Sequence, residues 1–197
     1  MTDILGLDHR ALKITEAIVN RVDVGMLHRP TPCAEWTLGQ LLAHMVGQNH
    51  GFAAAARGET SDLTVWADRP VGDDPGGVFA ESAATATAAF IEDGVLEREW
   101  WLPEIRGGQL FPARQAISFH LVDYVVHGWD VAAAIAVRTA FDADLLDAVL
   151  PIARQVPGGA SRQREDAQFQ PGEDAVAGGS TLDRILAMLG RSPNWPD

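Results

Sequence analysis

Apolar residues recur every three or four positions along most of the chain, the spacing that places them on one face of an α-helix. The first stripe predicts a helix over residues 4–23 and consists of Leu7, Ala11, Ile14, Ile18 and Val22. Comparable stripes predict further helices over residues 37–57, 74–93, 113–137, 145–152 and 180–190. The pattern therefore indicates a protein built mainly from helices.

Two of these helices begin with recognisable signals. Thr37 is followed three residues later by Gln40, the spacing of a capping box, in which two side chains pair with free backbone N–H groups of the first turn. Asp74 precedes Pro75, which suits the first helical position because proline has no N–H to leave unpaired. These signals place the starts of the second and third helices.

Two segments lack helical periodicity. Residues 98–112 contain paired aromatic residues, a proline and a Gly-Gly step, which favours a short β-hairpin or an extended loop. Residues 155–179 are rich in glycine, glutamine and charge, and we expect a long loop that is either mobile or laid over a site. Four main helices with long connections predict an all-α four-helix bundle with additional short helices. We expect residues 1–197 to form a single domain.

The composition restricts the functional classes. With 47% hydrophobic and 21% charged residues, the 197-residue chain has the balance of a globular protein rather than of a disordered one. Its formal net charge of -12 and its scattered basic residues argue against nucleic acid or an anionic membrane as a partner. Cys33 is the single cysteine, which excludes an intramolecular disulfide and a multi-cysteine zinc site.

The sequence also bears on localisation. No apolar run approaches the ~18 residues that suggest a membrane span. The first twenty residues have the pattern of an amphipathic helix, without the basic and apolar regions of a signal peptide. We therefore expect a cytoplasmic protein that has no membrane partner, and an oligomer is compatible with the sequence.

The helix predicted over residues 113–137 carries polar residues on one face, His120, Asp123, His127 and Asp130. Asp123 and His127 are four residues apart and could bind one metal ion together. Nearly one such pair is expected by chance in this composition, and a solvated helix face is the alternative. Position favours a site, because Asp123 lies in an apolar segment where an unpaired carboxylate would be costly to bury.

His44 lies in the apolar segment LLAHMVG of the second predicted helix. A single histidine there is usually a hydrogen-bonded core residue, but a bundle could bring it to Asp123 and His127. Two imidazoles and one carboxylate would leave open positions on a metal for water or substrate, as catalytic metal sites do. Cys33 could act as a nucleophile, although a buried small side chain is the commoner role.

Three segments resemble a known family: TPCAEWTLGQLLAHMVG, HLVDYVVHGWDVAAA and DRILAMLGRSPNW. Together they resemble actinobacterial metal-binding proteins related to the amino-terminal domain of mycothiol-dependent maleylpyruvate isomerase, in the DinB-like superfamily. The resemblance implies a four-helix bundle that holds a divalent metal, usually zinc. The roles of its three metal ligands fall on His44, Asp123 and His127.

The resemblance also implies a chemistry. Related proteins use the metal to bind a low-molecular-weight thiol as thiolate and transfer it to an electrophile. We therefore expect a metal-dependent enzyme, with Zn²⁺ as the expected metal, that uses mycothiol for S-transfer or isomerisation of a small electrophilic substrate. His120, one turn before Asp123, is the candidate catalytic residue, placed to hydrogen-bond a ligand or to move a proton.

Two departures separate the chain from the isomerase. Asp123 stands where the isomerase has glutamate, and the second domain of the isomerase, which contributes an active-site arginine, has no counterpart in these 197 residues. Isomerisation of maleylpyruvate itself is therefore not expected. Two alternatives remain: a non-catalytic module that binds a metal or small ligand, and a metal-activated hydrolase in which water takes the place of the thiol.

Overall fold

The computed structural model describes residues 3–33, 36–59, 62–105, 107–139, 141–157, 169, 171–172 and 178–196. Its α-helices are α1 (Ile4–Val19), α2 (Leu38–Ala56), α3 (Pro75–Phe90), α4 (Ala113–Ala134), α5 (Ala143–Ala153) and α6 (Thr181–Met188). The remaining elements are the strands β1 (Glu99–Leu102) and β2 (Gln109–Pro112) and the short 3-10 helices η1 (Val24–Met26), η2 (Leu63–Trp66) and η3 (Val95–Glu97). The all-α class with additional short helices and a β-hairpin is confirmed.

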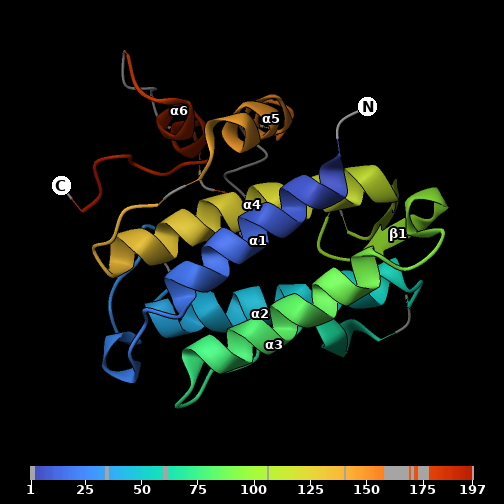
Figure 1. Cartoon of the computed structure of the whole chain (residues 1–197), viewed down its shortest axis with the longest axis horizontal. Coiled ribbons are helices and arrows are strands. Elements are labelled where there is room, and N and C mark those ends of the chain that lie inside the picture. Colours follow the sequence, from blue (N-terminus) through green and yellow to red (C-terminus); the bar gives the residue numbers. More distant parts are fainter. Residues whose placement is uncertain are drawn as a thin grey trace.

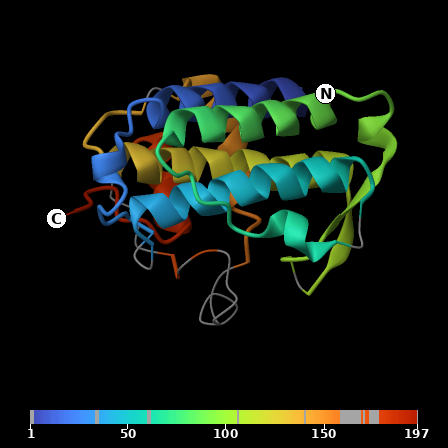
Figure 2. The same cartoon turned by 90° about the horizontal axis from the view of Figure 1, so that it is seen from below.

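The four long helices form a bundle of two layers (Figure 1). α1 packs along α4 in one layer, and α2 packs along α3 in the other. α5 and α6 pack on each other, and α5 also contacts α4, while the β-hairpin lies at one end of the bundle (Figure 2). None of the described helices combines the length and the apolar character that a membrane crossing requires.

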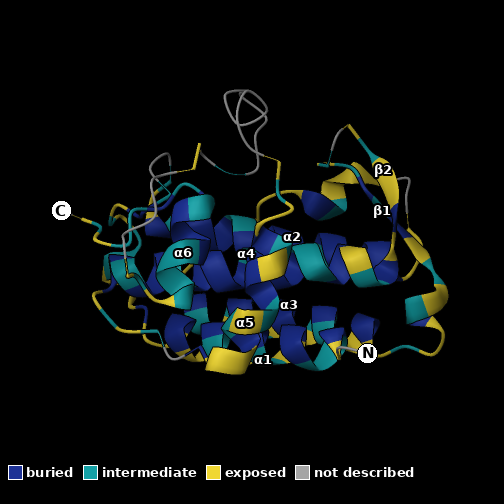
Figure 3. Ribbon diagram, turned by 90° about the horizontal axis from the view of Figure 1, so that it is seen from above, coloured by how far each residue is buried: buried dark blue, intermediate teal, exposed yellow. Residues whose placement is uncertain are grey.

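α4 is the central element of this arrangement. It contacts α1, α2 and α5, so that most of its residues are buried, whereas the outer side of α5 is exposed (Figure 3). A helix that is covered on several sides does not need a single apolar stripe. Polar residues of α4 therefore lie inside the protein and require partners there.

The capping signals are confirmed. Gln40 Oε1 accepts from the Thr37 N–H at 2.9 Å, and the Thr37 hydroxyl oxygen accepts from the Gln40 N–H at 3.4 Å. At α3, the Asp74 carboxylate accepts from the Gly77 N–H at 2.9 Å. Helix ends are less well predicted. α1 ends at Val19, four residues before the expected position, and α4 ends at Ala134, three residues before it.

Glycines of α2 allow the following connection to lie against this helix. A β-carbon at Gly51 would collide with the Trp66 ring, and one at Gly47 would lie 2.5 Å from the Ala67 carbonyl oxygen. Trp66 is buried at this contact, with its ring centroid 5.2 Å from that of Phe52. The connection containing Trp66 is thus anchored to the core.

A chain of buried hydrogen bonds crosses the four helices. His120 Nδ1 of α4 lies 2.7 Å from Asp8 Oδ1 of α1, and His120 Nε2 lies 3.3 Å from Asn49 Oδ1 of α2. Asn49 Nδ2 donates to the Ser82 hydroxyl oxygen of α3 at 2.9 Å, and the Ser82 hydroxyl donates to the Phe79 carbonyl at 2.8 Å. Asp8, Asn49, Ser82 and His120 are all buried. This network fixes the four helices relative to one another, because any displacement would leave a buried polar group unpaired.

We predict that Asp8→Ala lowers the free energy of unfolding by about 2 kcal/mol or more, because it leaves a buried ring nitrogen of His120 without an acceptor. Asp144→Ala is the matched control, since Asp144 pairs with Arg10 at the surface at 2.8 Å and should contribute little. Urea unfolding of both variants, followed by circular dichroism, measures the difference. Equal losses in the two variants would contradict the role of the network.

Candidate metal centre

His44, Asp123 and His127 meet between α2 and α4. One ligand atom of each side chain lies within 4.8 Å of those of the other two, and His127 Nε2 is 3.3 Å from Asp123 Oδ1. The neighbouring residues hold α2 and α4 in this relative position, because the Tyr124 hydroxyl of α4 donates to the Met45 carbonyl of α2 at 2.7 Å. We call His44, Asp123 and His127 the trio. In the part of the chain that the structure describes, it is the one group of three histidine, cysteine or acidic side chains with this geometry.

His44 has partners on two sides. Its Nδ1 lies 3.4 Å from Asp68 Oδ1, which follows η2, and this leaves Nε2 for a ligand. The ring of Trp36 lies with its centroid 4.5 Å from that of His44 and 6.1 Å from that of His127. Trp36 therefore forms an aromatic wall on one side of both imidazoles.

His127 is held by a buried ion pair. Its Nδ1 donates to Asp130 Oδ2 at 3.0 Å, while its Nε2 faces Asp123. Asp130 has no exposed surface, and both of its oxygens accept from Arg191, Oδ1 from Nε at 3.3 Å and Oδ2 from Nη2 at 3.0 Å. Asp130 lies in α4 and Arg191 follows α6, so the two residues of this ion pair come from distant parts of the sequence.

The charges of the trio shift its pKa values in different directions. Burial lowers the pKa of His127, but Asp123 and Asp130 outweigh this effect and raise it to about 9. Burial raises the pKa of Asp123, but His127 and His44 outweigh this effect and lower it to about 2. Burial and His127 lower the pKa of His44, against the opposing effects of Asp123 and Asp68. Without a metal, the trio at pH 7 therefore holds an imidazolium, a carboxylate and a neutral imidazole.

Further acidic groups lie near the trio. Glu104, in the turn between β1 and β2, accepts from Gln48 Nε2 at 2.8 Å, and Gln48 lies one turn after His44 on α2. Burial raises the pKa of Glu104, and the negative charges of Asp123 and Asp68 raise it further, against the lowering effect of Gln48. The surroundings of the trio are therefore acidic.

The structure brings together the three residues that the sequence predicts as metal ligands, and metal binding itself stays a prediction. A solvated polar face is wrong for α4, since His120, His127 and Asp130 are buried and Asp123 is only partly exposed. His120 does not join the trio. Both of its ring nitrogens face partners in the buried network, and its catalytic role stays a prediction.

Sequence patterns do not indicate Asp68, Glu104 or Arg191. Asp68 and Glu104 lie in connections, whose place on the bundle no periodicity specifies. Arg191 lies in DRILAMLGRSPNW, one of the three segments that resemble the family, and this was the available signal. Cys33, the candidate nucleophile, is partly buried before α2 and is not a member of the trio.

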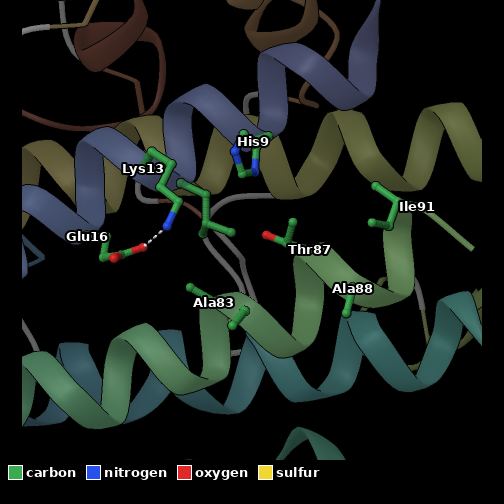
Figure 4. A pocket seen from close by; sticks show the side chains of 9 residues that line it. His9, Lys13, Glu16, Ala83, Thr87, Ala88 and Ile91 are labelled. Carbon is green, nitrogen blue, oxygen red and sulfur yellow. Dashed lines mark hydrogen bonds and ion pairs between the residues drawn. The ribbon is translucent and has the colours of Figure 1, made fainter.

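Two other regions of the chain bear on the extent of the site. Most of the loop expected over residues 155–179 lies outside the described residues. A shallow groove between α1 and α3 is lined by His9, Lys13, Ala83, Thr87, Ile91 and their neighbours, with Lys13 paired to Glu16 at its edge (Figure 4). No member of the trio lines this groove, which is therefore separate from the candidate metal centre.

Comparison with known proteins gives consistent results. Residues 9–132 match the family described as the mycothiol maleylpyruvate isomerase N-terminal domain. Two uncharacterized proteins, from two strains of Mycobacterium tuberculosis, are each 30% identical to this chain over 199 residues, which cover 96% of this chain and 98% of the relative.

Solved structures show the same fold. A mutant of the mycothiol-dependent maleylpyruvate isomerase superposes with a TM-score of 0.62 at 14% identity, covering 87% of this chain and 72% of the isomerase chain. Another crystal structure of that isomerase gives a TM-score of 0.60 at 14% identity, with coverages of 82% and 71%. The family match spans α2, α3 and all three members of the trio. The chain thus belongs to the mycothiol maleylpyruvate isomerase N-terminal domain family.

Proposed function

We propose that this protein is a metal-dependent enzyme that uses a low-molecular-weight thiol such as mycothiol for S-transfer to, or isomerisation of, a small electrophilic substrate. The observation that carries the proposal is the meeting of His44, Asp123 and His127 in a chain of this family. The names of the family and of its structural relatives refer to mycothiol, which favours a thiol over water as the second reactant. Residues 1–197 would act as one cytoplasmic metal-binding domain.

The donor set fits a divalent metal such as Zn²⁺. Two imidazole nitrogens and one carboxylate oxygen are ligands that zinc takes in catalytic sites, with a further position left open. The second nitrogen of each imidazole lies near a carboxylate, Asp68 for His44 and Asp130 for His127. Carboxylates in this position orient metal-binding histidines and raise their basicity.

The side chains around the trio have separate tasks in this proposal. A metal bound here would lower the pKa of a thiol and favour the thiolate near neutral pH. Trp36 excludes water from one side of the imidazoles, and Asp130 keeps His127 in place. Glu104 is the candidate acceptor for the thiol proton, since its raised pKa makes it a stronger base than an ordinary carboxylate.

The acidic surroundings bear on the substrate. Asp68, Asp123 and Glu104 place several carboxylates near one another, and these would repel a dianion such as maleylpyruvate. We therefore propose a neutral or cationic electrophile as the substrate.

The first test is thiol binding by the purified protein, after metal analysis. Calorimetric titration with mycothiol should give saturable binding to the zinc-loaded protein, no binding after removal of the metal by a chelator, and recovery when Zn²⁺ is restored. S-methylated mycothiol is the control and should bind weakly, because its sulfur cannot become a thiolate. Binding that does not depend on the metal would contradict the proposed function, and metal binding without thiol binding would favour a hydrolase or a non-catalytic module.

His127→Ala should weaken Zn²⁺ binding by more than about 100-fold, because an open three-ligand site has no spare donor. His120→Ala should weaken it by less than about tenfold, because the partners of His120 are Asp8 and Asn49 rather than a member of the trio. Competition with a chromophoric zinc chelator measures both affinities. Equal losses in the two variants would show that His120 takes part in holding the metal.

Zinc binding at pH 7 should release close to one proton from His127. The folded protein without metal holds this imidazole protonated up to about pH 9, whereas a metal ligand must be neutral. The apparent affinity should therefore rise by about tenfold per pH unit below pH 9 and level off above it. Calorimetry in buffers of different ionisation enthalpy counts the protons, and release near zero at pH 7 would contradict the assigned pKa.

The raised pKa of His127 also makes the free energy of unfolding of the metal-free protein depend on pH. Because the pKa of His127 is about 9 in the folded state and 6.5 in the unfolded chain, its stabilising effect is complete below pH 6.5 and disappears as the pH rises through 9. Urea unfolding of the metal-free protein should therefore show a loss of stability over this range. His127→Gln is the control and should lack this pH dependence.

A further inference from the structure

We propose that Arg191 and Asp130 form a positioning pair for the metal centre, through which the segment after α6 sets the metal affinity of His127. This inference rests on the proposed metal centre. It assigns neither residue to the trio. The pair acts on the metal through the orientation of a single imidazole.

The contacts run without interruption from Arg191 to the trio. The Arg191 guanidinium donates to both oxygens of Asp130, and Asp130 Oδ2 accepts from His127 Nδ1. The opposite ring nitrogen, Nε2, lies 3.3 Å from Asp123. Because the hydrogen bond at Nδ1 determines where the ring points, Asp130 also determines where Nε2 points.

Burial makes Asp130 dependent on Arg191. The two side chains are 0% and 1% exposed, so water cannot replace either partner. A buried carboxylate without a cation would be strongly destabilised. Two parallel hydrogen bonds fix the plane of the carboxylate, which a single ammonium group could not do.

The backbone fixes Arg191 in turn. Gly190 has a positive φ of 75°, which ends α6 and turns the chain. The Arg191 N–H then donates to the Leu186 carbonyl at 2.9 Å, and Arg191 Nη1 donates to the Leu189 carbonyl at 3.1 Å. The guanidinium is thus tied to the end of α6 at the same time as it holds Asp130.

The test uses Co²⁺, whose visible absorption reports both binding and coordination geometry. Asp130→Asn and Arg191→Met should each weaken Co²⁺ binding by about 10–100-fold, the effect of removing a group that orients a metal ligand. Arg191→Lys should restore part of the loss, because it returns the charge but not the two parallel hydrogen bonds. The absorption bands of Asp130→Asn should also shift, since His127 would no longer be held in one orientation.

The double variant Asp130→Asn with Arg191→Met separates this role from a general effect on folding. If Asp130 and Arg191 act through one chain of contacts, the Co²⁺ affinity of the double variant should be about the same as that of the single variant with the lower affinity. Arg184→Met is the matched control, because Arg184 lies in α6 and donates to Thr181 rather than to Asp130. It should leave the affinity unchanged within about twofold.

The outcomes are distinguishable. Additive losses in the double variant, or the same loss in Arg184→Met, would overturn the positioning role while leaving the metal centre intact. If the wild-type protein binds neither Co²⁺ nor Zn²⁺, the proposed metal centre fails and this inference fails with it. Circular dichroism of the metal-free variants checks folding. Should Arg191→Met not fold, Asp130→Asn and Arg191→Lys carry the comparison, and unchanged affinity in both would contradict the inference.

Discussion

Asp130 is a carboxylate with no exposed surface in α4, a largely buried helix of the bundle, and its charge must be balanced where it lies. Arg191 supplies the cation, and His127 supplies a third hydrogen bond. This requirement adds a polar connection between α4 and the segment after α6, beside the apolar packing that they share. The segment after α6 has to reach α4, and one imidazole of the trio has to point its second nitrogen toward Asp123.

Two polar layers follow one another along α4, and they satisfy burial in different ways. His120 is enclosed by hydrogen bonds to Asp8 and Asn49 from two other helices. One turn later, Asp123 and His127 meet His44 on a side that retains some exposure, with 21% of the Asp123 side chain accessible. In the first layer both ring nitrogens of His120 face hydrogen-bond partners, whereas in the second layer one ligand atom of each side chain lies within 4.8 Å of those of the other two. The same face of one helix therefore serves both packing and the candidate site.

The sequence predicts local features well because local features depend on nearby residues. Thr37 and Gln40 mark the start of α2 through contacts within one turn, and the spacing of Asp123 and His127 alone places both on one side of α4. The position of His44 relative to them depends on how two helices pack, and for this the resemblance to a family was needed. Spacing could not separate His120 from the ligands, since it lies on the same face as Asp123. Helix ends, such as that of α4, depend on where tertiary contacts stop, which periodicity does not encode.

The anchoring of Trp66 has a consequence for the outer wall of the site. Its ring occupies the space that Gly51 leaves free on α2, and Asp68 follows only two residues later. Two residues span at most about 7 Å, so Asp68, whose carboxylate lies beside His44, is close to Trp66 along the chain. The backbone that carries Asp68 is therefore held in place by the buried Trp66 ring and is not a free loop. The packing of the Trp66 ring against Gly51, two turns after His44 on α2, thus limits where the Asp68 carboxylate can lie relative to His44.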